Sequence, residues 1–347
     1  MSDTASDALS DTASDALPPI GGGLVPHLRY DAPMTTSIAV IGLGLMGQRM
    51  LSALGGQREF DCRLVWDLDP EATRKMSTQF GIPAAGSWRE ILENEVIEAL
   101  YIATPPASHG EYTRAALAAG KPVFVEKPLT VDLQDGEDLV RAAEESDLPV
   151  VVNFPFATLP GLERIQREIT SGEAGAVLRA DIQLHFSQWP RTWHNAGPWL
   201  SGPKEGGFLR EVFSHFAYLT QRLLGPLELQ SGSLGRTAQG TEEWAAAQFL
   251  AGSTPVFLSG GAGGAAPDFN RWTLYCENKS YRVEDWSMVQ ISDGAEWSDL
   301  MPEPGESHGL DKQLSEWSKA LRGEPHALAT AIDGCQVMRC VEALLNV

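Results

Sequence analysis

The feature that most constrains the fold is a regular alternation of apolar runs and amphipathic stretches between residues 37 and 154. The apolar runs are short and almost uninterrupted, as in strands covered on both faces, and the amphipathic stretches have the length and period of helices. The expected strands are 37–42, 62–67, 97–105, 121–128 and 148–154, and the expected helices are 45–55, 70–81, 109–120 and 131–147. This alternation predicts a doubly wound parallel sheet with helices on both faces.

The pattern changes after about residue 156. Ile182, Leu184 and Phe186 alternate with polar neighbours, which predicts a strand with one solvated face at 177–188. Further strands are expected at 227–232, 244–250, 255–261, 271–277, 281–285 and 288–292, and helices at 159–172, 208–224, 308–322 and 326–345. The chain is therefore expected to be α/β: a Rossmann domain at 34–155, then an α+β domain with a mainly antiparallel open sheet at 156–347.

The first 33 residues have a different composition. The octapeptide SDTASDAL occurs at 2–9 and again at 10–17, and PPIGGG follows it. Small, acidic and Gly/Pro-rich residues cannot bury enough apolar surface to offset the entropy of ordering the chain. Residues 1–33 are therefore predicted to be a disordered acidic tail.

Charge and cysteine usage restrict the function. The chain holds 46 acidic and 26 basic residues, and the net charge of -20 disfavours nucleic acids and anionic membranes as partners. The N-terminus lacks the basic start and apolar core of an export signal, and no apolar run is long enough to span a bilayer. The four cysteines form no C-x-x-C pair and no acidic or His cluster has metal-ligand spacing, which predicts a cytoplasmic location and no metal site.

A glycine-rich turn, GLGLMG, stands between the first expected strand and the first expected helix. Gly42, Gly44 and Gly47 form G-x-G-x-x-G, in which the glycines allow a tight turn, the approach of a pyrophosphate and close packing of helix on strand. Leu45 and Met46 open the helix, whose N-terminus is expected to hold the phosphates. The turn therefore predicts that this domain binds a dinucleotide.

Asp67 ends the second expected strand, where an acid hydrogen-bonds the adenosine ribose. A carboxylate there repels the 2'-phosphate of NADP, so NAD is the expected cofactor. Arg63 and Arg74 lie nearby in sequence and can offset that repulsion, which leaves NADP open. Asp69 is expected to cap the next helix, with Pro70 at its first position.

Glu126, Lys127 and Pro128 end the fourth expected strand, at the carboxyl edge where open α/β sheets bind ligands. From there Lys127 could reach a substrate hydroxyl near the nicotinamide. The alternative is a surface lysine in a proline turn, and the tripeptide alone does not separate the two.

Several motifs together, in order and spacing, resemble the glucose-fructose oxidoreductase, inositol dehydrogenase and MocA family. They are GLGLMG at 42–47, ATPPASH at 103–109, AGKPVFVEKPL at 119–129 and a later glycine-led helix that carries His215. The resemblance covers roughly residues 37–347 and implies a Rossmann domain plus an α/β domain whose open sheet often mediates oligomerisation. It also implies NAD(P)-dependent oxidation or reduction of sugars, polyols or related carbonyl compounds, by a homo-oligomer.

The resemblance assigns roles to residues of the first domain. Lys127 matches the lysine of the family's E-K-P motif, in which the peptide before Pro128 is often cis. The remaining residues that it places at the cofactor are Thr104, Pro105, Pro106, His109 and Glu126. Thr104 and the two prolines match the loop that lies along the nicotinamide ribose.

The resemblance also assigns partners to the lysine. The family's later motif carries an Asp and a His, and here Glu211 stands at the Asp position and His215 at the His position. Phe213 replaces the second glycine of that motif. This departure puts the role of Glu211 in doubt more than the role of His215.

The segment 208–224 is expected to be one helix with an apolar stripe and a second, polar stripe. The polar stripe, which includes Glu211 and His215, is either a solvated face with local ion pairs or a catalytic face. In the catalytic interpretation His215 is the base because its ordinary pKa lies nearest the working pH, and Lys127 stabilises the reacting oxygen or acts as the rival acid/base. Glu211 orients His215 or a substrate hydroxyl, and Arg210 is a further candidate substrate contact.

The segment 185–204 is rich in tryptophan and stands just before the glycine pair of that helix. Arg191 and Trp193 are the candidate substrate contacts there, through hydrogen bonds and stacking on a sugar face. A tryptophan of the core is the alternative for Trp193.

These observations predict an NAD(P)-dependent oxidoreductase that transfers hydride to or from a sugar-like, polyol or related carbonyl substrate. Two alternatives stay open: an NAD-dependent glycosidase of the same family, and a non-catalytic protein that binds NAD or sugar as a sensor.

Overall fold

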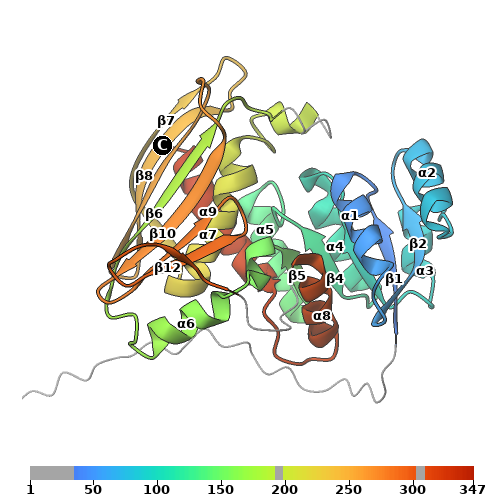
Figure 1. The fold of residues 1–347 in the computed structure, drawn as a ribbon. Coiled ribbons are helices and arrows are strands. Elements are labelled where there is room, and N and C mark those ends of the chain that lie inside the picture. Colours follow the sequence, from blue (N-terminus) through green and yellow to red (C-terminus); the bar gives the residue numbers. More distant parts are fainter. Residues whose placement is uncertain (1–34, 192–197, 302–308) are drawn as a thin grey trace, which may run out of the picture.

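The computed structural model describes residues 35–191, 198–301 and 309–347. Two sheets lie side by side, with helices between them and around the smaller one (Figure 1). The predicted tail at 1–33 lies outside the described residues, and so does Trp193.

The smaller sheet is the predicted parallel sheet. Its order is β14-β5-β4-β3-β1-β2, and β1 to β5 run parallel. These strands are β1 (Thr36–Ile41), β2 (Phe60–Trp66), β3 (Ala99–Ile102), β4 (Val123–Glu126) and β5 (Val150–Asn153). Most of their side chains are buried, as expected for a sheet with both faces covered.

The helices of this domain are α1 (Leu45–Leu54), α2 (Pro70–Phe80), α3 (Trp88–Glu93), α4 (His109–Ala118) and α5 (Leu133–Ser146). Asp69 caps α2 as predicted, since its side chain accepts a hydrogen bond from the Glu71 N–H at 2.9 Å. The short α3 was not expected from the sequence, because six residues are too few to show a helical period.

The larger sheet has eight strands in the order β13-β12-β11-β10-β6-β9-β8-β7. The strands are β6 (Val177–Phe186), β7 (Leu227–Arg236), β8 (Glu242–Ala251), β9 (Thr254–Ala262), β10 (Phe269–Cys276), β11 (Ser280–Glu284), β12 (Met288–Ser292) and β13 (Ser298–Asp299). All pairs are antiparallel except β6 with β9. The prediction of a mainly antiparallel sheet is confirmed.

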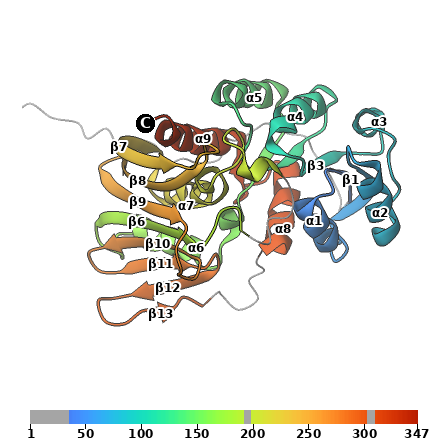
Figure 2. The same ribbon diagram turned by 90° about the horizontal axis from the view of Figure 1, so that it is seen from above.

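One face of the larger sheet is covered and the other is open. Viewed from above, α6 (Leu162–Thr170), α7 (Ser214–Leu224) and α9 (Ala331–Leu345) lie on the side that faces the smaller sheet (Figure 2). The inward residues Ile182, Leu184 and Phe186 of β6 are buried there, as their alternation predicts.

The C-terminal part of the chain returns to the smaller sheet. β14 (Ala329–Thr330) pairs antiparallel with β5, and the ring of Trp317 on α8 (Gly309–Leu321) stacks on Phe60 at 4.8 Å. This return was not predicted, because a two-residue strand has no detectable sequence pattern. The predicted domain limits, 34–155 and 156–347, therefore stay a prediction. A strand of the second predicted domain, β14, belongs to the sheet of the first.

The expected helix at 208–224 is not one uniform helix. Leu209–Phe213 forms a π-helix, and α7 follows it directly. Every residue from Ser214 to Gln221 is buried, so the predicted polar stripe is not a solvated face. The helix is enclosed because it lies between the larger sheet and the Rossmann domain.

Among the residues that the structure describes, no helix is long and apolar enough to cross a membrane. The same residues contain no group of three or more His, Cys, Asp or Glu side chains placed to hold a metal ion.

Candidate active site

The glycine-rich turn has the geometry that a pyrophosphate needs. Gly42 has φ 96°, and a Cβ there would lie 2.4 Å from the Ala103 carbonyl carbon. A Cβ on Gly47 would lie 2.0 Å from the Gly42 carbonyl oxygen, so these two glycines are required by the fold itself. At Gly44 a Cβ would meet nothing within 4 Å, and the residue is exposed.

The open space at Gly44 faces the start of α1. Gly44 is the N-cap of α1, and no side chain caps the helix. Leu45 is 38% exposed and Met46 is half-buried, so the first backbone N–H groups of α1 are accessible to an anion. These residues fit the diphosphate of a dinucleotide.

Asp67 lies beside this turn, just after β2. Its Oδ2 accepts a hydrogen bond from the Leu43 N–H at 2.7 Å, and its Oδ1 accepts one from the Asp69 N–H at 2.9 Å. Arg63 pairs with Asp61 at 2.7 Å, and Arg74 pairs with Glu71. Both guanidinium groups that could have favoured NADP are thus engaged with other carboxylates.

His109 connects the two loops of the carboxyl edge. The side chain is fully buried, with Nδ1 at 2.8 Å from the Pro128 carbonyl oxygen and Nε2 at 2.8 Å from the Thr104 carbonyl oxygen. Burial lowers the pKa of this imidazole below its ordinary value of 6.5. His109 therefore holds the Thr104 loop and the Lys127-Pro128 turn together, and its side chain is too deep to contact a cofactor itself.

The remaining loop residues differ in exposure. Pro105 is exposed and Pro106 is buried at the start of a short 3-10 helix, Pro106–Ser108. The Thr104 hydroxyl accepts a hydrogen bond from Ser108 Oγ at 2.7 Å. The Lys127-Pro128 peptide is cis, as the family resemblance implied.

The side chain of Glu126 points into the core of the sheet. Its Oε1 accepts hydrogen bonds from the Tyr101 hydroxyl and, at 2.7 Å, from Asn153 Nδ2. Gln313 on α8 donates in turn to Asn153 Oδ1 at 2.8 Å. Burial raises the pKa of Glu126 above its ordinary value, against the effect of these donors. Glu126 therefore anchors the end of β4, just before Lys127, and its predicted cofactor contact stays a prediction.

Lys127 and Glu211 form a buried ion pair across the two domains. Lys127 Nζ lies 2.8 Å from Glu211 Oε2 and 3.2 Å from the Glu211 carbonyl oxygen. The two side chains are only 11% and 13% exposed. Glu211 lies in the π-helix, a wide turn of the kind often found at functional sites. The interpretation of Lys127 as a surface lysine is thereby excluded.

His215 lies on the first turn of α7, and only 7% of it is exposed. Burial lowers the pKa of its imidazole well below the ordinary value of 6.5, and the positive charges of Lys127 and Arg191 act in the same direction. The imidazole is therefore neutral at pH 7. The prediction that His215 has an ordinary pKa is therefore wrong. Its role as a base is still possible, because the neutral imidazole is the form that accepts a proton.

Arg191 joins this group from the loop after β6. Its guanidinium lies 5.3 Å from the Phe186 ring centroid, and its charge acts on both Glu211 and His215. Partial burial lowers its pKa. Its partner in the prediction, Trp193, lies outside the described residues.

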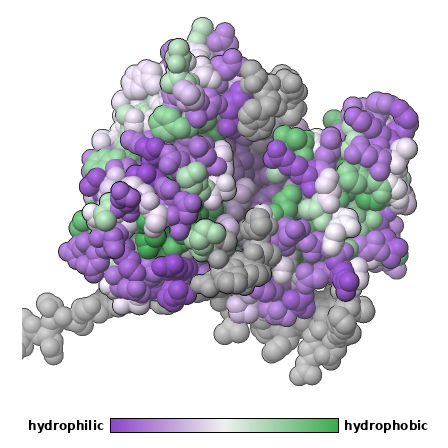
Figure 3. Space-filling view, viewed as in Figure 1, coloured by the Kyte–Doolittle hydropathy of each residue, from purple (hydrophilic) through white to green (hydrophobic). Residues whose placement is uncertain are grey.

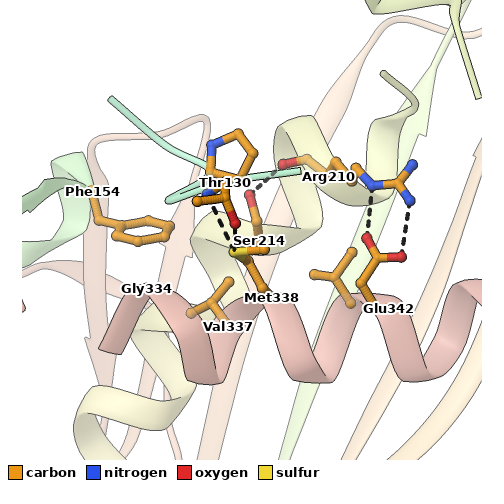
Figure 4. A pocket seen from close by; sticks show the side chains of 10 residues that line it. Thr130, Phe154, Arg210, Ser214, Gly334, Val337, Met338 and Glu342 are labelled. Atoms are coloured by element: carbon orange, nitrogen blue, oxygen red, sulfur yellow. Dashed lines mark hydrogen bonds and ion pairs between the residues drawn. The ribbon is translucent and has the colours of Figure 1, made fainter. Parts of the chain in front are cut away.

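Arg210 is directed away from this group. Its Nε and Nη2 donate to the two carboxylate oxygens of Glu342 at 2.8 and 3.0 Å, and its Nη1 donates to the Pro203 carbonyl oxygen at 2.8 Å. Figure 4 shows this ion pair at the edge of a small cavity that Thr130, Ser214 and Met338 line. Arg210 joins α9 to the π-helix, and its predicted substrate contact stays a prediction.

The sequence analysis missed three aromatic residues around His215. The ring centroids of Phe154, Phe156 and Trp286 lie 5.8, 6.2 and 5.2 Å from that of His215. Phe154 and Phe156 directly follow β5, at the carboxyl edge of the smaller sheet, and that position was the available signal. The space-filling view shows a hollow between the two sheet-bearing parts of the molecule (Figure 3).

Comparison with known proteins agrees with this geometry. Residues 36–154 match the family model described as oxidoreductase family, NAD-binding Rossmann fold. The chain is 34% identical over 152 residues to an inositol 2-dehydrogenase of Burkholderia lata, covering 42% of this chain and 44% of that protein. It is 29% identical over 201 residues to a dTDP-3,4-didehydro-2,6-dideoxy-alpha-D-glucose 3-reductase of Streptomyces violaceoruber, covering 56% and 58%. The chain thus spans about half the length of these curated relatives.

The fold is shared along almost the whole chain. A levoglucosan dehydrogenase solved in complex with NADH superposes with a TM-score of 0.80 at 17% identity, covering 90% of this chain and 96% of that one. The resemblance is borne out over residues 36–154, which match the model of the glucose-fructose oxidoreductase, inositol dehydrogenase and MocA family. That model describes an NAD-binding fold, which agrees with NAD as the predicted cofactor.

Proposed function

We propose that this protein is an NAD(P)-dependent oxidoreductase that transfers hydride to or from a sugar-like, polyol or related carbonyl substrate. The observation that carries the proposal is the Lys127–Glu211 ion pair, which joins the carboxyl edge of the cofactor domain to the helix that carries His215. Three side chains able to handle a proton or an oxygen charge thus gather next to a dinucleotide cradle.

Each residue has a role that follows from its surroundings. The Lys127 ammonium, held by two oxygens of Glu211, donates a further hydrogen bond to the reacting oxygen and stabilises the negative charge that develops there. The neutral imidazole of His215 accepts the hydroxyl proton during oxidation. Glu211 fixes the position of the ammonium, and Arg191 binds a substrate hydroxyl. The nicotinamide, when bound, accepts or supplies the hydride.

NAD is proposed as the preferred cofactor. Asp67 lies beside the glycine turn, where its carboxylate is placed to accept hydrogen bonds from the adenosine ribose, and Arg63 and Arg74 form ion pairs with Asp61 and Glu71. A 2'-phosphate would meet the negative charge of Asp67.

A panel of sugars and polyols, followed by the absorbance of NADH, tests the proposed activity. With the substrate so found, Lys127→Met is expected to lower kcat/KM by roughly a hundredfold or more, because the oxygen loses its charged donor. The Kd for NAD, measured by fluorescence, is expected to stay within about threefold. Lys75→Met, at an exposed lysine on α2, is the matched control.

Unchanged turnover in Lys127→Met would contradict the proposed roles. A chain that binds NAD tightly and oxidises nothing in the panel would instead match a binding protein, and release of an aglycone from an aryl glycoside would match a glycosidase.

We also propose that the open face of the larger sheet forms a homo-oligomer. Trp244 on β8 and Phe257 on β9 point outward from neighbouring strands, and Phe269 points outward from β10, on the other side of β6; the three are 47%, 41% and 38% exposed. Exposed aromatic side chains on an open sheet face are typical of an interface between subunits. Light scattering is expected to give a multiple of the chain mass, and Phe257→Arg to lower it. Val96→Arg, at an exposed residue of the Rossmann domain, is the control; a monomer in the wild type would contradict the proposal.

A cytoplasmic location remains a prediction from the cysteines and the N-terminal sequence.

A further inference from the structure

The turn between β11 and β12 has an unusual backbone. Asp285 and Trp286 follow each other with φ 47° and 70°, in the left-handed region. Two-residue hairpin turns of this hand are normally built from Gly, Asn or Asp, and a bulky side chain seldom adopts them. A tryptophan at this position needs a reason in the structure around it.

The turn is held by Asn270 of the neighbouring strand β10. The Asp285 N–H donates to the Asn270 carbonyl oxygen at 3.1 Å, and the Trp286 N–H donates to Asn270 Oδ1 at 3.1 Å. The Ser287 N–H closes the turn on the Glu284 carbonyl oxygen at 3.3 Å. These bonds fix the direction in which the indole leaves the hairpin.

The indole is directed at His215. Its centroid lies 5.2 Å from that of the imidazole with the planes at 83°, and it also stacks on Phe156 at 5.8 Å. Phe154 meets the imidazole from the end of β5. Three aromatic rings from two separate segments, the one that follows β5 and the β11–β12 turn, thus surround His215.

Trp286 differs from the other two rings in exposure. Phe154 and Phe156 are each 1% exposed and belong to the core, whereas Trp286 is half-buried. It is therefore the ring at the boundary between the enclosure and solvent. The charged groups that face His215 are Lys127 and Arg191, with Glu211 one turn earlier in the helix.

We propose that Trp286 is a positioning residue for the proposed reaction: its indole closes the aromatic enclosure of His215, keeps water from the imidazole and fixes its orientation toward the substrate. This inference rests on the proposed function of His215. Its physical consequence is independent of turnover, because removing the ring admits water to the imidazole and so raises the pKa of His215.

The pH titration of His215 tests this directly. In protein labelled with ¹³C-histidine, the imidazole signal that disappears in His215→Asn is followed by NMR. Trp286→Asn, which suits a left-handed turn, is expected to move the titration midpoint upward, toward the 6.5 of an exposed histidine. Met288→Asn is the matched control, since Met288 is 47% exposed on the same hairpin and is expected to leave the midpoint unchanged.

Trp286→Phe is expected to raise the titration midpoint of His215 by less than Trp286→Asn, since it keeps an aromatic ring in place of the indole. If Trp286→Asn fails to fold, the midpoint in Trp286→Phe is the test of the proposal. In a chain with measured turnover, the acid limb of the kcat/KM profile is expected to move upward with the midpoint, while the Kd for NAD stays the same. A midpoint that does not move in a folded variant overturns the role of Trp286. A midpoint that moves in a chain without dehydrogenase activity overturns the proposed function alone.

Discussion

Two segments of this chain begin with closely spaced glycines and run into a helix: 42–47, which leads into α1, and 206–207, which leads into the π-helix and α7. In the first, Gly42 packs against the backbone of Ala103 and Gly47 against that of Gly42, while Gly44 is left open. In the second, a Cβ on Gly206 would lie 2.2 Å from the Leu200 carbonyl oxygen. The same residue type thus makes room for a ligand in one segment and for the protein's own backbone in the other.

The comparison also separates what each helix start does. The N-terminus of α1 offers free backbone N–H groups and contributes no side chain to the chemistry. The second segment contributes Glu211 and His215 and is held from behind by the Arg210–Glu342 ion pair. Cofactor binding at the first segment therefore depends on backbone, and proton handling at the second on buried side chains.

The largest expected effect concerns Gly206. Gly206→Ala is expected to lower the free energy of unfolding by about 3 kcal/mol, because the new Cβ meets main-chain atoms that cannot move aside. Denaturant unfolding measures it. Gly55→Ala, where the nearest atom would lie at 3.5 Å, is the control, and equal stability of the two variants would contradict the comparison.

Gly44→Ala is expected to give the opposite result. Its Cβ enters open space at an ordinary φ of -66°, so the free energy of unfolding stays within about 0.5 kcal/mol of the wild type. The Kd for NAD is expected to rise roughly tenfold, about 1.4 kcal/mol, because the methyl group keeps the pyrophosphate from the backbone. Calorimetric titration with NAD checks this, and unchanged affinity would show that the diphosphate binds elsewhere.

The smallest expected effect concerns the choice between NAD and NADP. The wild type is expected to have the higher kcat/KM with NAD, and Asp67→Asn is expected to lower the ratio of kcat/KM for NAD to that for NADP roughly fivefold, since removing one partly exposed charge is worth about 1 kcal/mol. Glu145→Gln, at an exposed residue of α5, serves as the control. A wild-type preference for NADP would overturn the assignment.

Much of this molecule could be predicted from local signals. The five parallel strands, the glycine turn, the cap at Asp69 and the alternation along β6 each depend on a few consecutive residues, whose backbone freedom and apolar period are visible in the sequence. The pairing of Lys127 with the helix of Glu211 and His215 was implied by the family resemblance, and the structure brings Lys127 and Glu211 together.

Other features depend on contacts between distant segments, and only the tertiary structure decided them. Arg210 pairs with Glu342, 132 residues away, Glu126 turns inward to Tyr101 and Asn153, and β14 returns to a sheet that begins at the other end of the chain. The low pKa of His215 also belongs to this group, because it arises from burial among rings of two separate segments, 154–156 and the β11–β12 turn. Apolar periodicity and turn residues depend only on the segment in which a residue lies, so the sequence shows them. Desolvation and charge pairing depend on the residues that the tertiary structure brings into contact, and these come from distant segments.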